Sequence, residues 1–159
     1  VVDHRQFASR DLFDVTLAEA IDKYEPALIV LAGFMRILGA DFVKRYQGKI
    51  LNIHPSLLPD YPGTNTHQRV LDAGEKLHGV SVHFVTEELD GGPVIAQESI
   101  SIQSCDDVES LAIKTHEKEH LLYPIVASWF TDGRLRLDGN DAFLDEQLLP
   151  VTGKQIDTA

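Results

Sequence analysis

An uninterrupted apolar segment, ALIVLA at positions 27–32, constrains the fold more than any other feature of this sequence. A strand without alternating polar residues is typical of a sheet whose two faces are both covered. Segments with helical spacing of apolar residues lie on either side of it, and the same alternation of strand and helix continues along the chain. The pattern therefore predicts an open, mostly parallel α/β sheet, in which ligands bind beyond the carboxyl ends of the strands.

Capping residues, prolines and glycines predict where the individual elements begin and end. We expect one domain over residues 1–149 and a frayed C-terminal tail over residues 150–159. The expected helices are 9–24, 36–46, 66–73 and 106–132, and the expected strands are 27–32, 49–53, 79–86, 94–102 and 134–137.

The charge balance excludes several classes of function. Fourteen Lys and Arg residues stand against 25 Asp and Glu residues, which gives a formal net charge of −11. Such a surface repels nucleic acid and anionic membranes, although a small basic pocket for an anionic ligand remains compatible with it.

No apolar run reaches the roughly 18 residues of a membrane-spanning helix. The single cysteine, Cys105, excludes an internal disulfide framework and fits a reducing compartment.

Two polar side chains lie at the end of a predicted strand. Asn52 and His54 are two residues apart, so they project from the same face, while Leu51 and Ile53 point into apolar packing. The following proline favours an extended backbone at His54, which preserves this alternation. An amide and an imidazole would then meet where such sheets bind ligands. A polar strand end that only caps a loop is an equally good interpretation of the spacing.

Asp90 lies in the loop sequence EELDGG, and the two glycines after it allow a sharp turn close to a ligand. From composition alone, an ordinary acidic surface turn is the favoured interpretation. Asn, His and Asp together favour acyl transfer, because an amide and an imidazolium can stabilise an oxyanion while a carboxylate orients the imidazole. The sequence has no Gly-x-Ser-x-Gly elbow, and Cys105 lies outside these loops. This favours direct attack by the substrate's own nucleophile.

The helix over residues 106–132 contains HEKEH, which matches the zinc-binding pattern H-E-x-x-H through His116 and His120. A zinc hydrolase is therefore an alternative, but no third ligand follows, and a polar helix stripe is the favoured interpretation. His83 lies between Val82 and Phe84 in a predicted strand, and it is interpreted as a structural histidine.

Three long segments, VLAGFMRIL (30–38), LNIHPSLLPDYPG (51–63) and HGVSVHFVTEELDGGPVI (78–95), resemble the formyltransferase family of folate-dependent purine biosynthesis. The resemblance implies a Rossmann-like formyltransferase fold, 10-formyltetrahydrofolate as the formyl-donor co-substrate and glycinamide ribonucleotide as the acceptor. It implies a cytoplasmic enzyme with small-molecule substrates and no metal. Whether the protein is a monomer or a homodimer stays open.

The resemblance also implies roles for individual residues, with Asn52, His54 and Asp90 as the catalytic set. The implied folate-binding residues are Leu31, Met35, Arg36, Ile37, Leu38, Val85, Thr86, Glu87 and Glu88. The implied residues for the nucleotide substrate are Arg10, Ile53, Pro55, His116 and Glu119.

At its beginning the sequence departs from the family pattern. The family's N-terminal strand and its phosphate-binding loop have no counterpart here, so we expect a bare edge beside residues 27–32. A formyltetrahydrofolate deformylase, which uses water as the nucleophile, and a non-catalytic folate-binding module remain alternatives. A formyltransferase acting on tRNA is disfavoured by the charge of −11.

Overall fold

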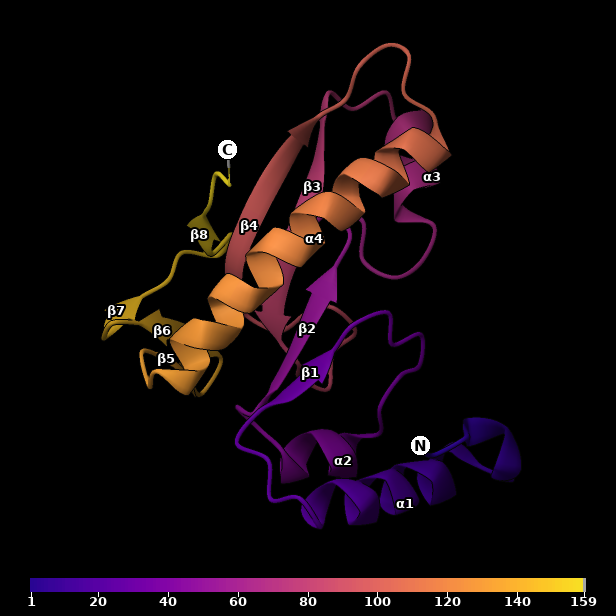
Figure 1. The fold of residues 1–159 in the computed structure, drawn as a ribbon, viewed down its shortest axis with the longest axis vertical. Coiled ribbons are helices and arrows are strands. Elements are labelled where there is room, and N and C mark those ends of the chain that lie inside the picture. The colour runs from indigo at the N-terminus through magenta and orange to yellow at the C-terminus, as the bar shows by residue number, and fades with distance from the viewer. Residues whose placement is uncertain (159) are drawn as a thin grey trace.

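A computed structural model describes residues 1–158, in which a five-stranded sheet has the order β1-β2-β3-β4-β8. Helix α4 crosses one face of this sheet, and α1 and α2 lie together near β1 and β2 (Figure 1). The helices are η1 (His4–Gln6), α1 (Arg10–Asp22), α2 (Ala40–Arg45), α3 (Thr66–Asp72) and α4 (Val108–Thr131). The main sheet contains β1 (Ile29–Leu31), β2 (Ile50–His54), β3 (Leu77–Phe84), β4 (Val94–Ser101) and β8 (Lys154–Gln155), and a smaller sheet contains β5 (Leu135–Asp138), β6 (Asp141–Leu144) and β7 (Gln147–Leu148).

Strand direction in the main sheet is uniform except for β3. Strands β1 and β2 pair in parallel, as do β4 and β8, whereas β3 runs antiparallel to both of its neighbours. The expected open α/β fold is therefore confirmed, with one reversed strand at its centre. Because β2 and β3 are antiparallel, Asn52 lies directly opposite His83.

Side-chain caps explain where two of the helices begin. The Ser9 hydroxyl accepts a hydrogen bond from the amide of Leu12 at the start of α1 (3.3 Å). At the start of α4, Asp107 and Ser110 form a reciprocal capping box. Helix α2 begins at Ala40 rather than at the expected position 36, because the buried Asp14 carboxylate accepts the amide of Gly39 (2.7 Å) and holds the preceding segment outside the helix.

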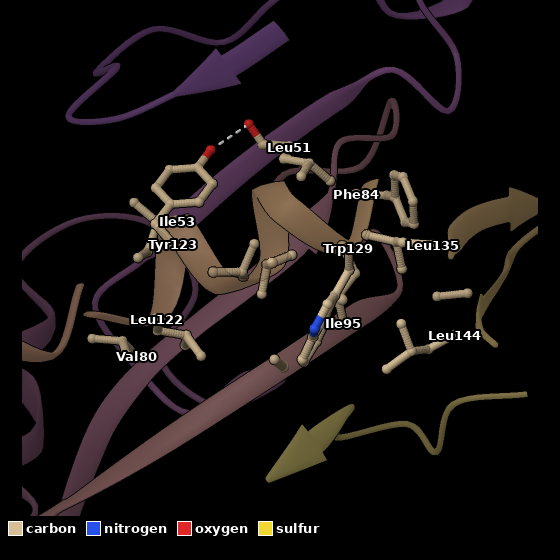
Figure 2. Packing of buried hydrophobic residues seen from close by; sticks show 14 residues of the cluster. Leu51, Ile53, Val80, Phe84, Ile95, Leu122, Tyr123, Trp129, Leu135 and Leu144 are labelled. Carbon is tan, nitrogen blue, oxygen red and sulfur yellow. Dashed lines mark hydrogen bonds between the residues drawn. The ribbon is translucent and has the colours of Figure 1, made fainter. Parts of the chain in front are cut away.

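The main core lies between α4 and the sheet and includes Leu51, Phe84 and Trp129 (Figure 2). Within it, the Tyr123 hydroxyl lies 2.8 Å from the carbonyl oxygen of Leu51, a contact drawn in Figure 2, and 2.9 Å from that of Leu31. Helix α4 is thereby attached to β1 and β2 at the level of Asn52. A second core joins α1 and α2 to the edge of the sheet.

Two expectations about the ends of the sheet are wrong. The segment 27–32 was expected to be buried on both faces, but Val30 is 49% exposed. The bare edge expected beside this segment is present in the described sheet, where β1 is the edge strand. The last residues were expected to fray, but β8 pairs with β4 and the Thr158 amide donates to the Glu98 carboxylate (3.1 Å). The hairpin strands β6 and β7 were not predicted. Within residues 1–158, no helix is both long and apolar enough to cross a bilayer.

Candidate active site

The alternation expected along β2 is present. Leu51 and Ile53 belong to the main core, whereas Asn52 and His54 point to the opposite face of the sheet. His54 is buried and Asn52 is partly exposed. The apolar side chains of β2 thus anchor the strand in the core, and its polar side chains are available for a site at its carboxyl end.

Both ring nitrogens of His54 face hydrogen-bond acceptors. Its Nε2 lies 2.9 Å from the carbonyl oxygen of Tyr61, and because a carbonyl only accepts, Nε2 is assigned the hydrogen. Its Nδ1 lies 3.5 Å from Oδ2 of Asp90. The carbonyl thus orients the ring, and Nδ1 is left directed toward the carboxylate.

Asp90 is held by backbone geometry as well as by hydrogen bonds. Its φ of 50° lies in the left-handed region, which Asp tolerates better than most residues. The amide of Gly63 donates to its Oδ2 (2.8 Å). Gly92 lets the same loop pass Phe84, since a Cβ at this position would lie 1.8 Å from the Phe84 carbonyl oxygen. The EELDGG sequence therefore forms a tight turn that presents a largely buried carboxylate to His54.

His83 joins these groups, a role that its position in a predicted strand did not indicate. Its Nδ1 donates to the carbonyl of Phe84 (2.9 Å), so its Nε2 accepts from the Asn52 amide (3.1 Å). The same Nε2 lies 3.7 Å from Asp90 Oδ1. Burial lowers the pKa of His83, which favours this neutral form. The alternation of residues 79–86 was visible in the sequence, but the pairing that places His83 opposite Asn52 was not.

A cleft of about 500 Å³, counting its open mouth, lies against Asn52, His83 and Asp90. Eight of the nine residues implied for folate binding line it: Leu31, Arg36, Ile37, Leu38, Val85, Thr86, Glu87 and Glu88. Met35 stands apart from them, because it is 81% exposed and does not line the cleft.

The residues implied for the nucleotide substrate are more dispersed. The Ile53 side chain is packed in the core, so only its backbone is available to a ligand. Arg10 is exposed at the start of α1, and Pro55 is partly buried after β2. On α4, His116 Nδ1 lies 3.2 Å from Glu119 Oε2. Burial raises the pKa of Glu119, and the nearby imidazoles of His116, His120 and His54 oppose that effect.

The zinc alternative gains no support from the geometry. The rings of His116 and His120 lie edge to face with their centroids 5.0 Å apart, and His116 pairs with Glu119. Within residues 1–158, no three His, Cys, Asp or Glu side chains are grouped so that they could hold a metal ion.

The sheet order, the helix across its face and the polar groups gathered beyond the end of β2 define a Rossmann-like α/β enzyme domain. A family model described as formyl transferase matches residues 1–127, and the chain belongs to this family.

Individual relatives agree with that assignment. Phosphoribosylglycinamide formyltransferase of Escherichia coli is 51% identical over 151 residues, which are 95% of this chain and 71% of that protein. The structure of phosphoribosylglycinamide formyltransferase from Coxiella burnetii aligns with a TM-score of 0.94 at 52% identity, over 99% of this chain and 74% of that one. A formyltetrahydrofolate deformylase from Pseudomonas syringae aligns with a TM-score of 0.81 at 25% identity, over 90% of this chain and 47% of that one.

Proposed function

We propose that this protein transfers a formyl group from 10-formyltetrahydrofolate to the amine of glycinamide ribonucleotide. Its relatives from E. coli and C. burnetii are named phosphoribosylglycinamide formyltransferase, which supports the transfer and its acceptor. One observation carries the proposal for the site. Asn52 and Asp90 line one cleft and are linked through His83 at 3.1 Å and 3.7 Å, and His54, which does not itself line the cleft, lies 3.5 Å from Asp90. The single exposed Cys105 is compatible with the expected cytoplasmic location.

In the proposed reaction the substrate amine bonds to the formyl carbon, and the carbonyl electron pair moves onto oxygen. Asn52 Nδ2 donates to that oxyanion, and so does His54 Nδ1 once the ring is protonated to the imidazolium, since Nε2–H is already bonded to the Tyr61 carbonyl. Asp90 accepts the proton released by the amine, directly or through water, and returns it to the folate nitrogen as the carbon–nitrogen bond breaks. The amine thus loses one proton and the departing nitrogen gains one.

The positions of the donors fit this scheme. Neutral His83 takes one hydrogen of the Asn52 amide, so the second hydrogen of the same NH₂ group is free to act toward the cleft. The 3.5 Å between His54 Nδ1 and Asp90 is longer than a normal hydrogen bond. His54 Nδ1 is therefore not held in a strong hydrogen bond with Asp90 and remains available to a bound ligand.

The two substrates are proposed to bind to different groups of residues. The apolar residues Leu31, Ile37 and Val85 suit the flat ring of a folate. The residues predicted to bind the nucleotide are Arg10, Ile53, Pro55, His116 and Glu119. We propose that Glu119 accepts hydrogen bonds from the ribose hydroxyls.

A deformylase remains the second candidate, because water could attack the same carbon and the deformylase from P. syringae shares the fold. The experiment is a turnover assay of the full-length gene product with and without glycinamide ribonucleotide. Formyl transfer that requires the nucleotide supports the proposal. Release of formate at the same rate without it supports the deformylase, and folate binding without either reaction supports a non-catalytic module.

Replacement of any one of Asn52, His54 or Asp90 by Ala should lower turnover at least about a hundredfold. Gln68→Ala is the control, because Gln68 is exposed and its side chain bonds only Asp72 among the described contacts. Wild-type turnover in one of the three variants would remove that residue from the mechanism.

A further inference from the structure

Behind His54, three buried polar side chains form hydrogen bonds that connect β4 and β3 to the backbone of the turn after β2. Gln97, on β4, is 3% exposed, and Ser81 on β3 and Ser56 after β2 are both 0% exposed. The Gln97 side-chain amide donates to the carbonyl of Leu58 (2.7 Å) and to the Ser81 hydroxyl (2.9 Å). None of these three side chains lines the cleft.

Ser81 connects the sheet to the turn that follows His54. Its hydroxyl donates to the carbonyl of Ser56 (2.6 Å) and accepts the amide of Leu58 (3.0 Å). The hydroxyl has one hydrogen and two acceptor positions, so with the bond from Gln97 its capacity is fully used. Because every hydrogen-bonding position of the Ser81 hydroxyl is occupied, the turn cannot shift without breaking one of these bonds.

The turn over residues 56–63 also contacts two of the proposed catalytic residues. Ser56 Oγ donates to the carbonyl of Asp60 (2.7 Å), which closes the turn. The Tyr61 carbonyl then accepts from His54 Nε2 (2.9 Å), and the Gly63 amide donates to Asp90 Oδ2 (2.8 Å). The same short segment therefore sets the orientation of the imidazole and of the carboxylate.

We propose that Gln97 is a positioning residue for formyl transfer, acting on His54 through Ser81 and the turn over residues 56–63. This inference rests on the proposed role of His54. An apolar side chain of the same size would fill the space that Gln97 occupies, but it would leave the buried carbonyl of Leu58 without its donor. The turn would then relax, and His54 would lose its fixed orientation. Displacements of about 1 Å at reacting groups can lower rates by up to a hundredfold.

The first test measures the wild-type protein, and a variant serves only to assign its signals. Long-range ¹H–¹⁵N correlation spectra report which imidazole nitrogen carries the hydrogen, and His54→Asn identifies the signals of His54. We expect hydrogen on Nε2 of neutral His54. A neutral ring with hydrogen only on Nδ1 would contradict the bond to Tyr61 and overturn the proposal.

The second test measures turnover in Gln97→Leu. We expect kcat to fall about ten- to a hundredfold, while KM for both substrates stays within about twofold. The spectrum of His54 should change to a mixture of tautomers. Thr115→Val is the matched control, since it also removes a buried side-chain hydrogen bond, from Thr115 Oγ1 to the Leu111 carbonyl, within α4. A folded Gln97→Leu protein with wild-type kcat would overturn the proposal.

A double-mutant cycle separates positioning from a general structural effect. In a His54→Ala background, measured by single turnover with excess enzyme, Gln97→Leu should change the residual rate by less than about threefold. An equal loss in both backgrounds would show that Gln97 does not act through His54. Wild-type turnover in His54→Ala would instead remove the proposed role of His54 itself. If Gln97→Leu does not fold, Ser81→Ala takes its place in the same cycle with the same expected outcomes.

Discussion

Close approach of backbone atoms determines which residues the loop around Asp90 can contain. The amide of Phe84 donates to the carbonyl of Pro93 (3.1 Å), which brings the ends of the loop together. Gly92 passes so near the Phe84 carbonyl that any side chain would overlap it. Asp90 itself adopts a positive φ, which costs of order 1 kcal/mol and is held by the Gly63 amide. The identity of these residues is thus dictated by the shape that presents the carboxylate.

Gly92→Ala should destabilise the protein by about 3 kcal/mol, because the new Cβ must displace backbone atoms. Gly133→Ala is the matched control. Gly133 has a φ of 71° with no atom within 4 Å of an added Cβ, so only backbone strain of about 1 kcal/mol is expected. Urea unfolding of the two variants measures the difference. Equal losses of stability would show that the loop can move away from Phe84.

Between α3 and β3 the contact depends on the protonation of two histidines. His67 Nδ1 and His78 Nε2 lie 2.9 Å apart, so one nitrogen must donate and the other must accept. Burial lowers the pKa of His78 to about 4, with smaller contributions from the neighbouring His67 and His54. Burial likewise lowers the pKa of His67. This hydrogen bond can therefore form only while at least one of the two rings is neutral.

Stability should fall as the pH drops from about 6.5 toward about 4. An unfolded histidine takes up its proton near pH 6.5, whereas His78 in the folded state does so near pH 4, so the unfolded chain binds more protons in this interval. We expect a decrease of several degrees in Tm over this range. The slope should be smaller in His78→Gln and unchanged in His120→Gln, which replaces an exposed histidine of α4. A wild-type slope in His78→Gln would contradict the assignment.

At the scale of the whole molecule, negative charge is in excess. The formal net charge is −11, and the ion pairs within the described structure, such as Arg134 with Asp145 and Arg45 with Asp22, are mostly on the surface. Exposed pairs of this kind contribute little to stability. Mutual repulsion of the excess carboxylates opposes the compact state, and dissolved salt screens it.

Raising NaCl from about 10 mM to about 300 mM at pH 7.5 should therefore increase Tm by a few degrees, as the screening length shortens from about 30 Å to below 10 Å. The increase should shrink at pH 5, where protonation brings the net charge nearer to zero. Differential scanning calorimetry at both pH values measures the effect. A fall in Tm with salt at pH 7.5 would mean that the ion pairs outweigh the repulsion.

Much of this molecule follows from short-range patterns in the sequence. Ser9 and Asp107 cap helices close to the expected starts, and alternation along β2 places Asn52 and His54 on one face. The family also follows, because its long segments keep their order and spacing. The bare edge at β1 also follows from the missing family segment. By contrast, the reversed direction of β3, the exposed side chain of Val30 and the pairing of β8 were not predicted.

The sequence by itself determined the four longer helices, strands β1 to β5, the polar end of β2 and the tight turn at Asp90, since propensity, capping and periodicity act over a few neighbouring residues. Only the tertiary structure decided that His83 lies opposite Asn52 and that Gln97 reaches the turn beside His54. These contacts join residues 31 and 39 positions apart. They depend on strand register and on the hydrogen bonds that buried polar groups must find, and both are set by the packing of the whole domain.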